Sequence, residues 1–375
     1  SIEEELRYRQ ITYKQDPQAN ETRGDLLLTD KDHNHFRINR QNKNGIKSRD
    51  DDADFHLACG ILQGYEVDAM CFAETNQEWN NSRAVHRCKQ ILHSVWDHAK
   101  FITSTSKIKY PHAYKPGGTC MAVVDNWSSR VSETGSDRHG MGRWTNMRLA
   151  GKDDKSLQIC TAYQSVKSDG DSTFHQQQSI IMTMEGNLKP NPQKQFIDDL
   201  MLQITEWQAQ GSEILLFLDA NELVGARAQG LARLVAECGL IDVMEARHGA
   251  SVNIPTYARG SKRIDYIFCT PAVYACITRC GILAYDTAVI SDHRGHFADL
   301  DLSELLGKNA EPLMPKSRRL LQTKNPATVY AYLSLLMKYT NDHKIEQRLA
   351  TLETSIINNG WNEDAISQLE GIDKD

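Results

Sequence analysis

The sequence lacks the features that mark membrane-spanning, secreted and zinc-ribbon proteins. Its 375 residues contain no run of about 18 or more apolar residues, so no segment is predicted to cross a membrane. The opening stretch SIEEELRYRQ is charged and holds no signal-peptide core. The nine cysteines include no CxxC pair, and Cys269, Cys276 and Cys280 lack the spacing of a zinc site. Reduced, mostly buried thiols in an intracellular protein are therefore expected.

A large excess of positive charge is also absent. Lys and Arg number 43 against 49 Asp and Glu, which gives a net charge of −6. This balance excludes a wholly basic nucleic-acid coat but leaves room for a local basic strip. We find no internal repeat and no low-complexity tract. The missing initiator Met and the abrupt end at GIDKD lead us to expect a piece of a longer chain.

The residue pattern divides the chain into three regions. Residues 1–35 are polar and read as an N-terminal extension, residues 36–303 alternate short apolar runs with helical patterns, and residues 304–375 read as a helical C-terminal extension or linker. In the last region Asn325 and Pro326 mark the start of a helix. Two apolar stripes follow, which we interpret as packing surfaces: Val329, Tyr332, Leu333 and Leu336, then Ile345, Leu349, Leu352 and Ile356.

In the middle region, several short apolar runs carry a polar residue at or near an end. In chain order these polar residues are Asn42, Glu74, Tyr163, Asp219 with Asn221, Asp265, and the adjacent pair Asp292 and His293. In a fold of two packed sheets, polar groups on several strand ends can converge at one rim. Each residue alone has a plainer explanation, since an Asp after a strand is commonly a helix cap or turn former. The whole set, in this order, is much harder to explain as caps.

The ordered set resembles the endonuclease/exonuclease/phosphatase superfamily, which has the DNase I-like fold. The resemblance covers about residues 36–303 and rests on QNKNG, FAETN, TAY, LDANE, KRIDYIF and ISDHR. It is closest to the endonuclease domains of LINE-type retrotransposons, judged from QNKNGI, GGTCMAV, GRWT and the helical tail. The resemblance implies an α+β fold. Its form would be a four-layer α/β/β/α sandwich of two packed mixed β-sheets flanked by helices, plus a helical C-terminal tail.

The resemblance also implies a divalent metal. Glu74 would be its principal ligand, assisted by Asn42 and Asp292. Hard carboxylate and amide oxygens suit Mg²⁺ or Mn²⁺, with water in the remaining positions.

The remaining motif residues would act on water and phosphate. Asp219 and Asn221 would hold the attacking water, and Asp219 would take its proton. His293 would contact the scissile phosphate, either as a base or as a clamp. Asp265 would orient His293 and favour its cationic form, and Tyr163 would donate its hydroxyl to the phosphate.

Substrate contacts are expected from a segment close to Asp265. Thr256 matches a family position that lines the cleft, and Arg259, Lys262 and Arg263 form a basic cluster that either contacts DNA phosphate or is merely solvated surface. A second basic run, KSRR at 316–319, follows the domain.

Two positions depart from the family pattern. Asn44 stands where DNA-repair members have an acid, although LINE-type members also have Asn there, so metal binding should survive with fewer charged ligands. Val166 stands where many members have a substrate-facing Asn. Either the register shifts there and another side chain contacts phosphate, or that contact is missing.

Three functions remain open from the sequence. The first is a Mg²⁺-dependent DNA endonuclease, fused to a downstream reverse transcriptase and acting in the nucleus, that nicks target DNA for a retroelement. The second is a phosphodiesterase or phosphatase of the same fold that acts on inositol phosphates or nucleotides. The third is a catalytically inactive relative that binds nucleic acid. The intact acids and His293 speak against the third.

Overall fold

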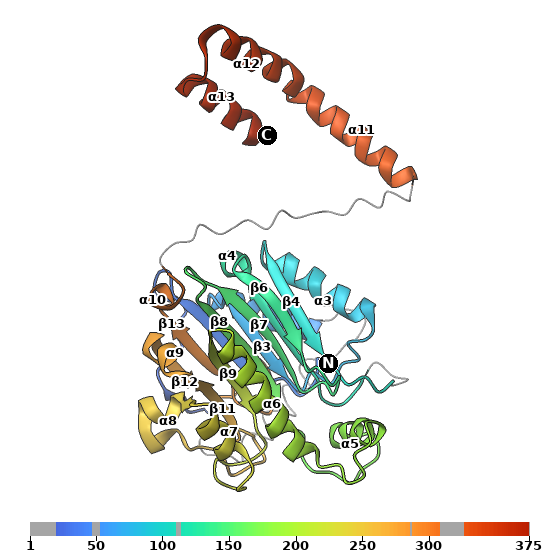
Figure 1. The fold of residues 1–375 in the computed structure, drawn as a ribbon, viewed down its shortest axis with the longest axis vertical. Helices are drawn as coiled ribbons and strands as arrows, with labels where there is room; N and C mark the ends of the chain where they lie inside the picture. Colours follow the sequence, from blue (N-terminus) through green and yellow to red (C-terminus); the bar gives the residue numbers. More distant parts are fainter. Residues whose placement is uncertain (1–19, 47–52, 110–113, 286, 308–325, 375) are drawn as a thin grey trace. The chain divides into compact units, whose positions relative to one another are not determined.

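The computed structural model describes residues 20–46, 53–109, 114–285, 287–307 and 326–374. The chain divides into two compact units, Ser1–Met314 and Pro315–Asp375 (Figure 1). The larger unit contains two sheets, and the smaller one contains helices.

The two sheets of the larger unit have seven and six strands. The first sheet runs, edge to edge, β1 (Arg23–Gly24), β12 (Ile277–Ile282), β13 (His296–Leu300), β2 (Phe36–Asn42), β3 (Ala69–Ala73), β5 (Thr119–Val124) and β4 (Ala99–Ser104). The second runs β10 (Ile241–Asp242), β11 (Asp265–Cys269), β9 (Ser212–Asp219), β8 (Ser156–Tyr163), β7 (Trp144–Ala150) and β6 (Val131–Ser136). Both sheets are mixed, because β2 pairs with β3 and β8 with β9 in parallel.

Helices cover the outer faces of both sheets, which makes four layers. The inter-sheet core is apolar and includes Ile38, Met121 and Phe217. The helices of this unit are α2 (Ala53–Gly64), α3 (Ser82–Val95), α4 (Asp125–Ser128), α5 (Phe174–Met184), α6 (Pro192–Ala209), α7 (Leu231–Glu237), α8 (Val243–His248), α9 (Pro271–Cys276) and α10 (Ser303–Leu306), with the 3₁₀ turn η1 (Gly249–Val252). Of these, α2 and α3 pack on the first sheet, and α6 and α7 pack on the second. The predicted sandwich of two mixed sheets flanked by helices is confirmed.

Helix α6 shows how local sequence sets this packing. Asn191 caps its first turn by accepting from the Lys194 amide at 3.1 Å, and Pro192 occupies the first helical position, where a missing N–H costs nothing. The apolar residues that recur at helical spacing are buried against the second sheet: Ile197, Leu200, Ile204 and Trp207.

The N-terminal region contributes to the sheet. Residues 23 and 24, which the sequence pattern assigns to a polar extension, form β1 and pair with Gly281 and Ile282 of β12. All nine cysteines lie in described segments, are buried and form no disulfide, as expected.

The smaller unit consists of α11 (Pro326–Asp342), α12 (Ile345–Asn359) and α13 (Glu363–Lys374). Helix α11 is described from Pro326 onward, and its predicted cap, Asn325, lies outside the described residues. The two predicted apolar stripes are largely open: α11 has no buried residue, and only Leu352 of the second stripe is buried. Across the described residues, no helix combines the length and apolarity that crossing a membrane requires.

Candidate functional site

The polar residues singled out by the sequence meet at one end of the sandwich, which we call the site end. Asn42 closes β2, Glu74 directly follows β3, and Tyr163 and Asp219 close β8 and β9. Register places Tyr163 beside Asp219, and Asp219 beside Asp265, the first residue of β11. Parallel neighbours finish at the same edge, so each sheet brings its acids to this end.

The amide of Asn42 connects the two sheets. Its Nδ2 donates to Glu74 Oε2 at 2.8 Å and to Asp219 Oδ2 at 2.7 Å, and it lies 3.4 Å from His293 Nε2. Its Oδ1 accepts from the Asn44 amide at 2.9 Å. One buried side chain therefore fixes the separation of two carboxylates and an imidazole.

His293 is held through its ring and through its main chain. Its Nδ1 lies 3.0 Å from Asp265 Oδ2. Its main chain is tied to β2, because Gln41 Nε2 donates to the His293 carbonyl at 2.7 Å. The His293 amide donates to Ser291 Oγ at 3.1 Å, and Ser291 Oγ donates to the Asn42 carbonyl of β2. The Asp292–His293 pair of the ISDHR motif thus sits on a loop that is fastened to a core strand.

Three residues of the site end have left-handed backbone conformations. The φ angle is 48° at Asn44, Glu74 and Asn221. Such angles are uncommon without glycine and cluster at functional sites. The surroundings enforce them: the Gly45 amide donates to the Glu74 carbonyl at 2.8 Å, and Asn221 Nδ2 donates to the Gln164 carbonyl at 2.8 Å.

A glycine pair supports the loop that carries Glu74. The carbonyls of Gly117 and Gly118 accept from the amides of Asn76 and Thr75 at 2.8 and 3.2 Å. Gly117 has φ of 87°, and a Cβ there would lie 2.2 Å from the Phe174 ring. The absence of a side chain at Gly117 leaves room for the Phe174 ring beside the GGT turn.

Burial and mutual proximity shift the acidity of this cluster. Burial, and then the Asp265 carboxylate, raise the pKa of Asp219 to about 7. Burial also raises the pKa of Glu74, although the hydrogen bond from Asn42 opposes it. Burial, aided by Glu74 and Asp219, raises the pKa of the Tyr163 hydroxyl well above its usual value. These carboxyl groups crowd together with little water to screen them.

The pKa values of His293 and Asp265 shift in the directions opposite to those that burial alone would give. Burial would lower the pKa of His293, but the carboxylates of Asp265, Asp219 and Asp292 outweigh it and raise that pKa to about 9. Burial would raise the pKa of Asp265, but the charges of Arg40 and His293 hold it below its usual range. The pair is therefore an imidazolium beside a carboxylate near neutral pH.

The donor set fits a divalent cation. Single atoms of Glu74, Asp219 and His293 lie within 4.8 Å of one another. Asp292 Oδ2 accepts from Asn44 Nδ2 at 2.9 Å, while its buried Oδ1 has no hydrogen-bond partner among the described residues. The Asp292 charge also raises the pKa of Glu74, so a cation between them would relieve both. Asn42 presents its nitrogen, not its oxygen, to the carboxylates.

The four expected substrate-contact residues fall into two groups. Arg259 and Lys262 are exposed. Arg263 is buried: its Nη2 pairs with Asp242 Oδ1 at 2.6 Å, and its guanidinium lies 4.6 Å from the centre of the Tyr266 ring. Thr256 is also buried, and its Oγ1 accepts from the amides of Ile264 and Asp265 at 3.0 and 3.2 Å. In this structure Thr256 and Arg263 hold the loop before β11 in place.

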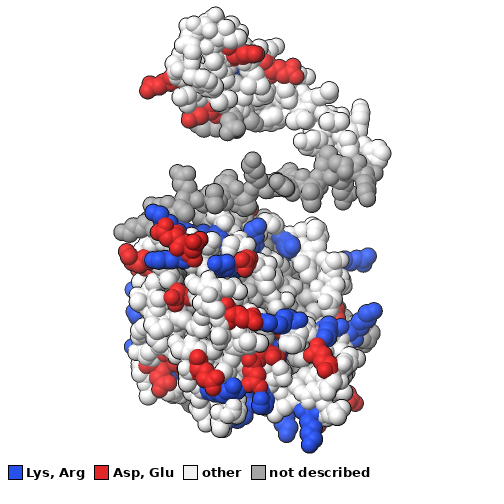
Figure 2. Space-filling view, in the orientation of Figure 1, with Lys and Arg blue, Asp and Glu red and all other residues white. Residues whose placement is uncertain are grey.

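Other residues considered from the sequence are also placed. Val166 is 56% exposed after the end of β8. Arg143 and Trp144 are fully buried. The 316–319 run lies outside the described residues. On the face of the larger unit visible in Figure 2, residues of both signs are interspersed.

Sequence reasoning missed Arg40. It lies two residues before Asn42 in β2, is fully buried, and its Nη1 donates to Asp265 Oδ1. A signal was present: alternation along a strand puts residues 40 and 42 on the same face, so an arginine inside a core strand points toward the same layer as the site.

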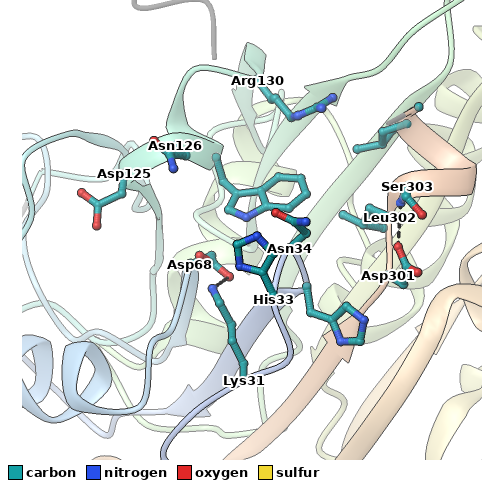
Figure 3. Close-up of a pocket in the computed structure, with 14 residues that line it drawn as sticks. Lys31, His33, Asn34, Asp68, Asp125, Asn126, Arg130, Asp301, Leu302 and Ser303 are labelled. Atoms are coloured by element: carbon teal, nitrogen blue, oxygen red, sulfur yellow. Dashed lines mark hydrogen bonds and ion pairs between the residues drawn. The ribbon is translucent and has the colours of Figure 1, made fainter. Parts of the chain in front are cut away.

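A separate hollow of about 620 Å³ lies at the opposite end of the sandwich, which we call the base end. It is bordered by segments that precede β2 and β3 and by the segment that follows β13 (Figure 3). Lys31 pairs there with Asp68, and the Ser303 amide donates to Asp301 Oδ1 at 3.0 Å. None of the site-end residues borders this hollow.

Solved structures share this fold. An AP endonuclease from Leishmania major, LMAP, matches with a TM-score of 0.54 at 12% identity, over 71% of this chain and 87% of that one. The 3′ phosphatase NExo (D146N) from Neisseria, bound to product DNA hairpin, matches with a TM-score of 0.50 at 13% identity, over 71% of this chain and 99% of that one. At this identity the likeness establishes the fold, which is the DNase I-like fold expected from the sequence.

A retrotransposon endonuclease domain is also similar, at a lower level. The domain of TRAS1, described as a telomere-specific non-LTR retrotransposon, has a TM-score of 0.45 at 14% identity, over 73% of this chain and 100% of that domain. No family model matches the sequence, and no curated protein matches it.

Proposed function

We propose that the protein is a divalent-metal-dependent phosphodiesterase that nicks DNA and leaves a 3′-hydroxyl end. The observation that carries the proposal is the Asn42 amide, which joins an acidic pair, Glu74 and Asp219, to the His293–Asp265 pair. Together these groups supply a cation site, a base and an imidazole that faces phosphate. Phosphodiester hydrolysis by water uses all three.

Glu74 and Asp292 are the proposed ligands of Mg²⁺ or Mn²⁺, with Asn42 as a further ligand. The unpartnered Asp292 Oδ1 supports this assignment. Asn42 can offer its oxygen to the metal only after its side-chain amide flips, because Nδ2 faces the carboxylates in this structure. The bound ion would polarise a phosphate oxygen and stabilise the leaving alkoxide.

Asp219 is the proposed base for the attacking water, with Asn221 beside it. A general base is most effective when its pKa lies near the working pH, and the pKa of Asp219 is raised to about 7 by burial and by Asp265. His293 remains cationic and faces the phosphate, while Asp265 orients its ring. The Tyr163 hydroxyl stays protonated, because its pKa is raised by burial, and it can donate to phosphate.

DNA is the proposed substrate. Arg259 and Lys262 are exposed in the segment before Asp265 and are the proposed phosphate contacts. The names of the proteins that share the fold support a nucleic acid, since one is an AP endonuclease and another was bound to a DNA hairpin. A 3′-hydroxyl can prime a polymerase, so we propose a retroelement role beside a downstream reverse transcriptase, exercised in the nucleus.

The first test is nicking of supercoiled plasmid with Mg²⁺, with Mn²⁺ and with excess EDTA. Activity should require the metal, and Glu74→Gln should lose most of it while keeping the fold. Glu133→Gln is the matched control, because Glu133 is exposed on β6 and remote from the site. Full nicking in excess EDTA would sink the metal assignment.

The second test concerns the ends of the nick. A DNA polymerase with labelled nucleotides, added without phosphatase treatment, should extend the nick at once. Extension only after a 3′-phosphate is removed would refute the polarity. Hydrolysis of inositol phosphates or nucleotides with plasmid left intact would favour a phosphodiesterase or phosphatase of another substrate class. DNA binding without any hydrolysis would identify an inactive relative.

A further inference from the structure

Arg40 occupies an unusual place for an arginine. It lies in the centre of the first sheet, on β2, with no exposed surface. Its Nη1 crosses to the second sheet and donates to Asp265 Oδ1. Its Nε and Nη2 have no hydrogen-bond partner among the described residues. Burying a guanidinium with two unpaired donors destabilises the folded state. The presence of Arg40 at this position therefore needs an explanation other than stability.

The reason lies in the acids that face it. Asp219 and Asp265 stand directly opposite each other on the antiparallel strands β9 and β11, and both are fully buried. Like charges at opposite positions of an antiparallel pair repel, and burial strengthens the repulsion. An arginine stays charged at every working pH. Arg40 therefore supplies a permanent counter-charge to this acidic pair.

The two oxygens of Asp265 have different partners. Oδ1 accepts from Arg40, and Oδ2 lies 3.0 Å from His293 Nδ1. A carboxylate held at one oxygen cannot rotate freely about its side-chain bond, so the Arg40 contact fixes where the other oxygen meets the imidazole. The ring orientation of His293 then depends on Arg40, which lies on the other sheet from Asp265.

We propose that Arg40 is a positioning residue for hydrolysis: it holds Asp265 so that Asp265 can orient His293. The kinetic consequence rests on the proposed function. Partners that orient the groups of a site commonly change activity about 10- to 100-fold when they are removed. Arg40→Met should lower kcat by about that factor and leave KM for DNA within about threefold, because Arg40 touches no substrate.

The same strand offers a matched control. Arg37 is also fully buried and also pairs with an aspartate, Asp299, through Nε at 2.7 Å and Nη2 at 2.8 Å. Its Nη1 donates to the carbonyls of Leu28 and Tyr65, each at 2.7 Å, so all its nitrogens have partners. Arg37→Met should lower stability, and the folded fraction should keep the kcat of the parent.

The kinetic experiment compares Arg40→Met, Arg40→Lys, Asp265→Asn and the Arg40→Met/Asp265→Asn double variant. If Arg40 acts through Asp265, the double variant should be no more than about twofold slower than Asp265→Asn alone. Arg40→Lys, which keeps the charge, should recover at least part of the loss and also serves if Arg40→Met does not fold. Losses that multiply fully in the double variant, or a parental kcat in Arg40→Met, would overturn the proposal.

A second readout does not need activity. With ¹⁵N-labelled histidine, the His293 Nδ1 proton bound to Asp265 should give a resonance that Asp265→Asn removes. Arg40→Met should shift or broaden that resonance at constant pH, whereas Arg37→Met should not. An unchanged resonance in Arg40→Met overturns the positioning role. If the parent nicks no DNA with either metal, the proposed function fails, and this comparison still decides the role of Arg40.

Discussion

Two buried arginines three residues apart on β2 each pair with an aspartate from another strand. The two pairs lie toward different ends of the larger unit. Arg37–Asp299 lies toward the base end, and Arg40–Asp265 toward the site end. Every side-chain nitrogen of Arg37 donates to a carboxylate or carbonyl oxygen. Arg40 leaves two nitrogens unpartnered among the described residues and shares its aspartate with His293.

By this difference, the Arg37–Asp299 pair stabilises the fold, and the Arg40–Asp265 pair positions groups of the proposed site. A buried ion pair stabilises only when the remaining donors are satisfied, and the Arg37 pair meets that condition. The Arg40 pair does not, because two of the Arg40 nitrogens have no partner among the described residues. The site end keeps crowded charge, and the base end carries none of the proposed chemistry.

The sharpest test of this contrast is removal of the His293–Asp265 pair. His293→Ala should reduce the nicking rate about a hundredfold or more, the usual scale for one positioned group, and Asp265→Asn should reduce it similarly with little change in DNA affinity. Because the two residues act as a unit, the double variant should be little slower than the worse single variant. Single-turnover kinetics on plasmid would measure this, and fully multiplying losses would show that the residues work independently.

The sequence indicated the strands that carry the polar residues and predicted many of the residues that meet at the site end. Strand β9 is a short apolar run that ends in an acid, and β3 is one that an acid follows directly, so both the strand and the acid can be recognised locally. Arg40 could not be found in this way, because its partner Asp265 is 225 residues away and the pairing exists only after two sheets pack. Local pattern cannot report which distant acid an interior arginine meets.

The basic cluster shows a second limit of sequence reasoning. Arg259, Lys262 and Arg263 look alike in the sequence, but only the first two are exposed. Arg263 lies between Asp242 and the Tyr266 ring, which neighbouring strands bring to it. The tail helices show a third limit, since their apolar stripes are visible in the sequence while most of α11 stays exposed.

The base-end pair should dominate stability. Asp299→Asn leaves the buried Arg37 without its charge partner, which should cost about 3–5 kcal/mol of unfolding free energy. Denaturant unfolding would measure this loss, provided that the slope of the free energy against denaturant concentration is the same for both proteins. The protein that remains folded should nick at the parental rate, because Asp299 is remote from the site. A loss of kcat that exceeds the loss of folded protein would erase the distinction between the two ends.

His296 on β13 is the register partner of Arg40 on β2 and offers a pH test. Burial lowers the pKa of this fully buried imidazole to about 3, so it is neutral when folded. The unfolded chain protonates it near pH 6.5. A folded pKa below the unfolded one means that its contribution to stability is complete above about pH 6.5 and is lost as pH falls toward 3.

The unfolding free energy of the parent, minus that of His296→Gln, should therefore fall by about 1.4 kcal/mol per pH unit between about pH 6 and 4. Taking the difference between the two proteins cancels the other groups that titrate in this range, such as Asp68, whose pKa burial raises to about 6. A constant difference across this range would mean that His296 is already protonated in the folded state.

The smallest expected effect concerns surface charge at the two ends. Changing both Arg259 and Lys262 to Ala should weaken binding to every DNA sequence about equally and reduce the salt slope of binding by about one per lost phosphate contact. Binding measured with EDTA keeps the DNA intact. Lys152→Ala/Lys155→Ala removes the same charge from the turn between β7 and β8 at the base end, where both lysines are exposed. A local strip would make only the first double variant weaker. Equal losses in both would mean that net charge alone acts, and parental binding in both would place the DNA-binding surface elsewhere.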